Sequence, residues 1–356
     1  MFRLLGPTLD KAVLCGLTLL LAGCPGGGAK EFEDLGSELE AKRQAVLRSP
    51  LTERTQASIR NLLTVHDEHW IEGDGRKFLR EELQSYHILN ARANDPKLDA
   101  DDAPRAVIAR YGEMLARRGI DFLVVPIPHS IHLYADHLPG CEPVEDYVVP
   151  DPAWFGELIR LWHRDVETLD LLQDLIPERE STDHGPLYFV HDAHWTPRGA
   201  ALAAGIVAQR IREYDWYAES PLKEGADYRR EWRRGLRMLD EYPGRDFDRL
   251  EFDVDCILGP DGEPLHEKDE TSPVLILGNS YVRWYEEYGA DLMSHLHAQT
   301  GLSFDAIALL GQGGTRVWHT LKRREDPLAG KKLVIWFVSY SLLRFHRLEY
   351  VDLEKP

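Results

Sequence analysis

Short runs of apolar residues recur along the chain, separated by longer segments in which apolar and polar positions alternate with helical spacing. The runs lie at residues 122–125, 274–277, 304–310 and 333–338. Continuous apolar runs of this length are typical of strands that are buried on both faces of a parallel sheet. Because helical segments stand between them, the pattern predicts an α/β fold, a mostly parallel sheet with helices on both faces.

The helical segments carry recognisable start and stop signals. Pro104 opens a helix that ends at Gly119, and Thr196 is a predicted N-cap for a helix that begins at Pro197 and runs to Ile211. Residues 151–175 also have helical periodicity, and 30–62 form a charged leading helical segment with a sparse apolar stripe. Residues 213–272 are rich in Arg, Asp, Glu and Gly, and we expect loops and short elements there.

The N-terminus has the pattern of an export signal. Arg3 and Lys11 precede an apolar run at 12–22, which is too short to remain as a membrane-spanning helix. Leu21-Ala22-Gly23-Cys24 then resembles the bacterial lipobox, in which the cysteine is acylated and becomes the new N-terminus. We therefore expect a signal peptide at 1–23 and lipidation of Cys24, with the protein held at a membrane by its lipid and facing the periplasm or the cell surface. The alternative is an ordinary signal peptide that happens to contain a cysteine.

Length and charge limit the classes of protein that fit. Removing the signal from the 356 residues leaves enough chain for one large domain, and we expect a tether and leading helix at 24–69 followed by a single domain at 70–350. The net charge of −18 gives no electrostatic basis for binding nucleic acid. It would also repel the chain from anionic lipid, so the acylated cysteine would provide the anchor.

Two of the four cysteines would remain in the mature domain. Cys141 and Cys256 could form a disulfide in an oxidising compartment, or could be two buried thiols. The sequence leaves both readings open, because it does not show whether the two Cα atoms lie close enough. The cysteine spacing is not that of a zinc site.

Candidate chemistry gathers where predicted strands end. The apolar run 274–277 leads into Gly278-Asn279-Ser280, which places a hydroxyl on a tight turn beside backbone N–H groups that could bind an oxyanion. Asp192 and His194 stand two residues apart before the Thr196 cap, so in an extended segment their side chains point to the same side. A carboxylate that orients an imidazole, which in turn activates a serine, is the minimum set for nucleophilic catalysis.

Each of these motifs also has a plainer explanation. Gly-Asn-Ser forms ordinary turns, and Asp-x-His can be a hydrogen-bonded loop. His191, Asp192 and His194 are all residue types that bind metals, but three ligands within four residues rarely complete a tetrahedral site. We therefore expect no metal and no cofactor.

Taken together, these segments resemble a known family. Gly278-Asn279-Ser280 resembles the nucleophile block of SGNH hydrolases, and the stretch from Asp192 to Ala200 resembles the Asp-x-His-Trp block of the alginate O-acetyltransferase group of the AlgJ and AlgX type. Further agreement comes from Asp74-Gly75 with Glu82-Leu83, from Val124-Val125-Pro126, and from Gly313-Gly314 followed by Val334-Ile335-Trp336. The resemblance covers roughly residues 70–345.

The resemblance implies an SGNH-hydrolase-like fold and a role for each matching residue. Ser280 would be the nucleophile, His194 the general base and acid, and Asp192 its orienting carboxylate, while the backbone of Ser280, with Gly313 or Gly314, would bind the oxyanion. We also expect Trp195 and Tyr281, neighbours of the base and the nucleophile, to line the substrate pocket. The implied partners are an exported polysaccharide as acceptor and a membrane-bound O-acyltransferase as acetyl donor.

Three functions remain open at this point. The first is O-acetyl transfer to an exported polysaccharide through an acetyl-serine. The second is an esterase with the same triad and water as the acceptor. The third is a non-catalytic lipoprotein that scaffolds a polysaccharide-export complex.

Overall fold

The computed structural model describes most of the chain after the predicted signal. The described residues are 29–92, 104–142, 147–181, 185–219, 228–237, 251–265, 269–311, 313–344 and 348–354. None of the helices within them is both long and apolar enough to cross a membrane.

A five-stranded sheet forms the centre of the molecule. Its spatial order is β4 (Glu167–Thr168), β3 (Asp121–Ile127), β9 (Leu333–Ser339), β7 (Val274–Gly278) and β8 (Asp305–Ala308). All four pairings are parallel. Every residue of β7 is buried, as are six of the seven in β9, because helices cover both faces. The predicted α/β fold with a mostly parallel sheet is confirmed.

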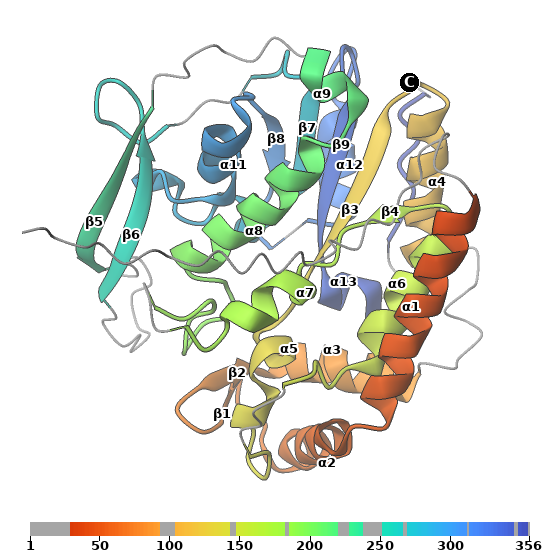
Figure 1. The fold of residues 1–356 in the computed structure, drawn as a ribbon, viewed down its shortest axis with the longest axis vertical. Helices are drawn as coiled ribbons and strands as arrows, with labels where there is room; N and C mark the ends of the chain where they lie inside the picture. The colour runs from red at the N-terminus through yellow and green to blue at the C-terminus, as the bar shows by residue number, and fades with distance from the viewer. Residues whose placement is uncertain are drawn as a thin grey trace, which may run out of the picture.

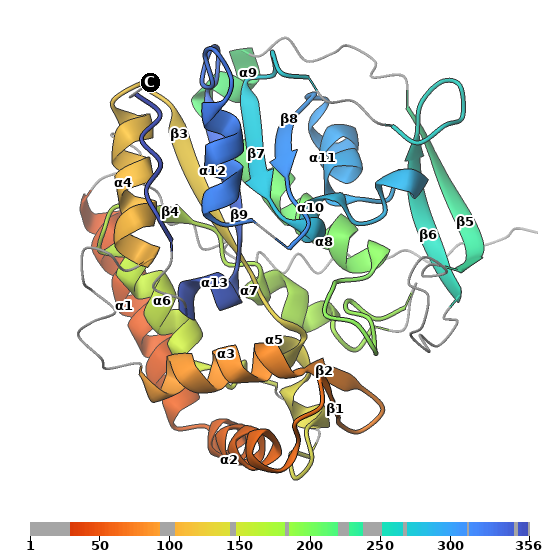
Figure 2. The same cartoon turned by 180° about the vertical axis from the view of Figure 1, so that it is seen from behind.

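Helices pack on the two faces of this sheet (Figures 1 and 2). On one face lie α6 (Pro152–Trp162), α7 (Leu172–Leu175) and α8 (Pro197–Ile211), and on the other lie α4 (Pro104–Ala116) and α12 (Thr315–Lys322). α1 (Ala29–Leu47) packs outside α6, and α11 (Leu292–Thr300) packs beside α8.

A group of smaller elements closes the carboxyl end of β3 and β9 (Figure 1). It comprises α2 (Pro50–Val65), the hairpin of β1 (Trp70–Glu72) and β2 (Lys77–Leu79), α3 (Arg80–Ala91), α5 (Ser130–Tyr134) and α13 (Tyr340–Arg344). The predicted leading helical segment is thus two helices, α1 and α2. Leu39, Val46 and Ile59 belong to the same hydrophobic core as the sheet, so this segment is built into the fold.

The described parts of 213–272 are more regular than the sequence predicted. They contain the short helix α9 (Asp215–Glu219) and a long antiparallel hairpin of β5 (Arg229–Arg237) and β6 (Glu251–Leu258). Val254 and Cys256 of β6 share a small buried cluster with Phe189 and Tyr285. The prediction of loops and short elements is wrong for Arg229–Arg237 and Glu251–Leu258, which form paired strands.

The remaining described elements are short. They are α10 (Ser280–Arg283) and the 3-10 helices η2 (Ala135–His137), η3 (Ile176–Glu178) and η4 (Glu286–Tyr288).

Pro126 lies within β3, although a proline cannot donate to the hydrogen-bond ladder of a sheet. The Val124 carbonyl accepts from the Leu169 N–H on the β4 side of the strand. Pro126, two residues on, faces the same side, but β4 pairs only as far as Val124. The missing N–H of the proline therefore costs no ladder hydrogen bond.

Cys141 and Cys256 do not form a disulfide, which was one of the two possibilities that the sequence left open. Both are free and buried. Cys141 belongs to the main core, and its Sγ atom lies 3.9 Å from the Thr55 hydroxyl oxygen. Cys256 belongs to the separate small cluster that also contains Phe189 and Tyr285.

Candidate active site

Ser280 is the first residue of α10, immediately after the carboxyl end of β7. Gly278 allows the turn to be tight, because a Cβ there would lie 2.5 Å from a methyl carbon of Val282. Asn279 caps the short helix, and its side-chain oxygen accepts from the Tyr281 N–H at 3.1 Å. The serine is held at a fixed place on the sheet edge and is 8% exposed.

His194 and Asp192 come from the loop before α8. The Asp192 Oδ1 atom accepts from the His194 Nδ1–H at 2.6 Å and from the His194 backbone N–H at 2.8 Å. On the other side of the ring, His194 Nε2 lies 2.8 Å from the Ser280 hydroxyl. In this arrangement Nδ1 carries the proton, and Nε2 is left to accept from the serine. The structure thus brings together the three residues that the sequence proposed as a triad.

Aromatic residues next to Ser280 tie its segment to the His194 loop. The Tyr281 hydroxyl donates to the Ala193 carbonyl at 2.7 Å, and the Tyr285 hydroxyl donates to the Trp195 carbonyl at 2.9 Å. Trp284 stacks on the imidazole of His194, with ring centroids 4.1 Å apart and an interplanar angle of 7°. The relative position of nucleophile and base is therefore fixed by several contacts.

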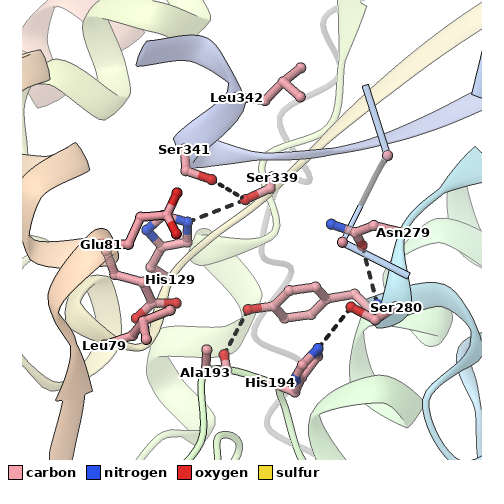
Figure 3. A pocket seen from close by; sticks show the side chains of 14 residues that line it. Leu79, Glu81, His129, Ala193, His194, Asn279, Ser280, Ser339, Ser341 and Leu342 are labelled. Atoms are coloured by element: carbon pink, nitrogen blue, oxygen red, sulfur yellow. Dashed lines mark hydrogen bonds between the residues drawn. The ribbon is translucent and has the colours of Figure 1, made fainter. Parts of the chain in front are cut away.

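A cavity of about 380 Å³ opens beside Ser280 (Figure 3). Ser280, His194, Asn279 and Tyr281 form one of its walls. The other lining residues come from the starts of α3 and α13, from the ends of β3, β8 and β9 and from the His194 loop: Leu79, Glu81, Glu82, His129, Ala193, Gly311, Gly313, Ser339, Ser341 and Leu342. The site thus lies at the carboxyl edge of the sheet, where ligands bind in open α/β folds.

The wall across from Ser280 is polar and was not predicted. Glu82 is 3% exposed, and its carboxyl accepts from the Ser130 hydroxyl at 3.2 Å. Burial raises the pKa of the Glu82 carboxyl well above its usual range; the Ser130 hydrogen bond opposes this shift, and the charge of Asp192 adds to it. His129 Nε2 lies 3.3 Å from the Ser339 hydroxyl. The criterion that identified Ser280, a polar residue at the end of a predicted strand, also applies to His129 and Ser339.

Some of the remaining predicted site residues line the cavity and others do not. Tyr281 and Gly313 line the cavity. Gly314 is the N-cap of α12 and is not among the lining residues. The prediction that Trp195 forms a pocket wall is wrong: its side chain is fully buried, and its indole N–H donates to the Tyr281 carbonyl at 3.1 Å.

No metal-binding group is found in the part of the chain that the structure describes. There, no three His, Cys, Asp or Glu side chains gather where they could hold a metal ion, and this includes the His191-Asp192-His194 stretch.

A parallel sheet with a serine and an Asp–His pair at its carboxyl edge is an arrangement found in serine hydrolases and serine acyltransferases. The chain belongs to the family described as the SGNH hydrolase-like domain of acetyltransferase AlgX, whose model matches residues 87–339. This match covers well over half of the chain.

Relatives in Pseudomonas agree with this assignment. The probable alginate O-acetylase AlgJ of Pseudomonas aeruginosa is 30% identical over 108 residues, which are 30% of this chain and 26% of that protein. The alginate biosynthesis protein AlgX of the same organism is 30% identical over 111 residues, which are 31% of this chain and 23% of that protein. The matched part thus spans about a quarter of each relative.

A solved structure supports the fold. The O-acetyltransferase domain of Pseudomonas putida AlgJ matches with a TM-score of 0.56 and 15% sequence identity, over 78% of this chain and 93% of that chain. At this identity the similarity concerns the fold alone.

Proposed function

We propose that the protein is an O-acetyltransferase that acetylates an exported polysaccharide through an acetyl group carried on Ser280. The observation that supports this most directly is the pair of contacts at His194, 2.8 Å from the Ser280 hydroxyl and 2.6 Å from the Asp192 carboxylate. Membership in an acetyltransferase family supports acetyl as the transferred group.

In the first half of the reaction, the Ser280 hydroxyl oxygen attacks the carbonyl carbon of an acetyl donor while His194 Nε2 takes the hydroxyl proton. The tetrahedral oxyanion then collapses and the bond to the donor oxygen breaks. His194 returns its proton to the departing oxygen, which leaves acetyl-Ser280 and a neutral imidazole. Asp192 stabilises the imidazolium formed between these two steps and keeps the ring in one orientation.

In the second half, an acceptor hydroxyl takes the place of the donor. His194 removes the proton of the hydroxyl as its oxygen attacks the acetyl carbonyl. When the second tetrahedral adduct collapses, the bond to Ser280 breaks and the serine recovers the proton from His194. The product is an O-acetylated sugar and the starting enzyme.

Backbone N–H groups of Ser280 and Gly313 are the proposed donors to the oxyanion. Gly313 lies so close to the serine turn that a Cβ there would be 2.9 Å from Asn279 Cβ and 3.1 Å from Asn279 N. Gly314 has less support for this role, since it caps α12 and does not line the cavity.

The polysaccharide and the donor are proposed from relatives. The relatives named above are alginate proteins, and we propose by analogy an exported polysaccharide as acceptor and a membrane-bound O-acyltransferase as acetyl source. We also propose that the mature chain begins at a lipidated Cys24 and acts in the periplasm or at the cell surface, which would bring it to such a donor. The proposed domain boundaries remain 24–69 for the tether and leading segment and 70–350 for the acyltransferase domain.

Acetyl transfer and ester hydrolysis can be separated in one assay. A chain starting after Cys24 is incubated with p-nitrophenyl acetate, with and without oligosaccharides, and compared with Ser280→Ala. We expect acetylated oligosaccharide from the wild type, and a rate lower by about 10³-fold or more in Ser280→Ala. If all of the acetyl released from p-nitrophenyl acetate appears as free acetate, the enzyme is an esterase and this proposal is replaced. Equal rates in wild type and Ser280→Ala would refute both.

A further inference from the structure

Several polar side chains that line the cavity are not used in the acyl-transfer steps, and Figure 3 shows three of them, His129, Ser339 and Ser341, across from Ser280. We call this set the far wall. It consists of Glu82 at the start of α3, His129 after β3, and Ser339 and Ser341 at the end of β9 and the start of α13.

The far wall is held in place by a buried network. The His129 backbone N–H donates to Nδ1 of the His132 ring at 2.9 Å. The proton of the His132 imidazole is therefore on Nε2, which donates to Asp151 at 3.0 Å. The side chains of His132 and Asp151 are completely buried. The His129 ring then reaches Ser339, and the Ser339 hydroxyl lies 2.9 Å from the Ser341 hydroxyl. Such support is what a binding site needs to keep its polar groups in fixed positions.

Glu82 is the most unusual member of the far wall. Among the described residues, Ser130 is the one hydrogen-bond partner of its carboxyl, which leaves this cavity-lining residue with unused hydrogen-bonding capacity. Burial raises the pKa of this carboxyl, which favours its neutral form relative to that of an exposed glutamate. A neutral carboxyl can both donate and accept a hydrogen bond.

We propose that the far wall binds the acceptor sugar, with Glu82 and Ser339 hydrogen-bonded to hydroxyls of a ring that presents another hydroxyl to acetyl-Ser280, and with His129 positioning the Ser339 hydroxyl. This rests on the acyl transfer proposed above and names the part of the site that selects the acceptor. The described residues that line the cavity include no lysine or arginine, whereas Glu81 adds a second carboxyl. The ring therefore turns a hydroxyl-bearing edge toward this wall, and not a carboxylate. A volume of about 380 Å³ is within the range of small-molecule sites.

The test measures binding without chemistry. In a Ser280→Ala background, dissociation constants are measured by calorimetry for three β-1,4-linked tetrasaccharides, one neutral, one of uronate and one of amino sugar. The tightest binder is the probe. Adding Glu82→Ala should weaken its binding about five- to tenfold, the effect of one lost hydrogen bond. Adding Glu82→Gln should restore most of the affinity, because an amide also donates, and the exposed Glu325→Ala is the matched control with no expected effect.

A second variant, Ser339→Ala, keeps the proposal testable if Glu82→Ala does not fold. It removes only a hydroxyl group. We expect about fivefold weaker binding, with a melting temperature close to that of the parent. The proposal fails if no tetrasaccharide binds, or if both variants bind the probe as tightly as the parent.

The binding result is independent of the proposed function. Selective loss of binding in Glu82→Ala without any acetylation of wild-type Ser280 would overturn the transferase and keep the sugar site. Acetylation of Ser280 with unchanged binding in both Glu82→Ala and Ser339→Ala would do the reverse.

Discussion

His194 is the residue on which the contacts of the site converge. Asp192 fixes its Nδ1 side, Ser280 occupies its Nε2 side, and Trp284 stacks on its face. The ring therefore has one orientation and one tautomer before any substrate binds, and little reorganisation is needed when the proton moves.

The role of Asp192 can be tested by replacing only its charge. Asp192→Asn keeps the size of the side chain but can favour the other tautomer of His194, and it does not stabilise the imidazolium. We expect kcat for acetyl-enzyme formation to fall by about 10³- to 10⁴-fold, with the protein still folded. Burst kinetics with p-nitrophenyl acetate measures this, and a fall of less than about tenfold would contradict an orienting role.

The sequence was sufficient to propose the triad but not the wall across from it. Ser280 and the Asp192-His194 pair sit in local patterns whose chemistry can be read from neighbouring residues. His129 and Ser339 reach the site because β3 lies next to β9 and β9 next to β7, whereas Glu82 comes from α3, which packs against α13. Apolar runs of similar composition do not reveal that order.

At the scale of single elements, α11 depends on a buried N-cap. Asp291 Oδ1 accepts from the backbone N–H groups of Met293 at 2.7 Å and Ser294 at 3.0 Å, and its other oxygen accepts from the Ser294 hydroxyl at 2.7 Å. Burial raises the pKa of Asp291 to about 6 in spite of these hydrogen bonds. The folded state therefore binds the Asp291 proton more tightly than the unfolded chain does.

This cap predicts a pH dependence of stability. The contribution of protonated Asp291 is fully present below the unfolded pKa near 4 and is lost as pH rises through about 6. Asp291→Asn keeps an oxygen for the cap and cannot ionise. Relative to this variant, the wild type should lose about 2 kcal/mol of unfolding free energy between about pH 4 and pH 7.5. Urea titrations at both pH values measure the difference, and an unchanged difference would contradict a buried, titrating cap.

A buried ion pair joins α4 to α6 and α13. The Arg105 guanidinium contacts Glu157 and also donates to the Leu343 carbonyl at 3.1 Å, and neither charged side chain is more than 2% exposed. Arg105→Met should lower the unfolding free energy by about 3 kcal/mol, since it leaves the buried Glu157 with Arg160, 3.5 Å away, as its remaining cationic partner among the described residues. Arg105→Met with Glu157→Leu should recover most of this loss. A double variant as unstable as the single one would show that the pair itself is needed.

The hairpin of β5 and β6 shows where pattern reading failed at this scale. β5 reads RREWRRGLR, with no clear alternation of apolar and polar residues, because most of its described side chains are exposed. The apolar alternation is in β6, where Val254, Cys256 and Leu258 are buried. A strand that gains its order from its partner gives a weak signal of its own.

At the scale of the whole molecule, the chain was recognisable as one α/β unit because its strand and helix periods alternate. The position of the leading segment could not be predicted, because α1 reaches the core by packing on α6, which comes more than a hundred residues later in the sequence. The proposed lipid anchor lies outside the described residues.

The anchor has a direct test in cells. Cys24→Ala in the full-length chain should move the protein from the membrane fraction to the soluble periplasmic or released fraction, because a net charge of −18 disfavours binding to anionic lipid. A chain carrying Cys15→Ala is the matched control and should remain with the membrane. Membrane association that survives Cys24→Ala would contradict lipidation at this residue.

The central claim is that acetyl is carried on Ser280. The most direct measurement is peptide mass spectrometry of wild type, Ser280→Ala and His194→Ala, each quenched in acid after brief exposure to p-nitrophenyl acetate. We expect one added acetyl group on the peptide containing Ser280 in the wild type, little in His194→Ala, and none at this position in Ser280→Ala. An unmodified Ser280 in wild-type protein that still turns over the ester would contradict the account.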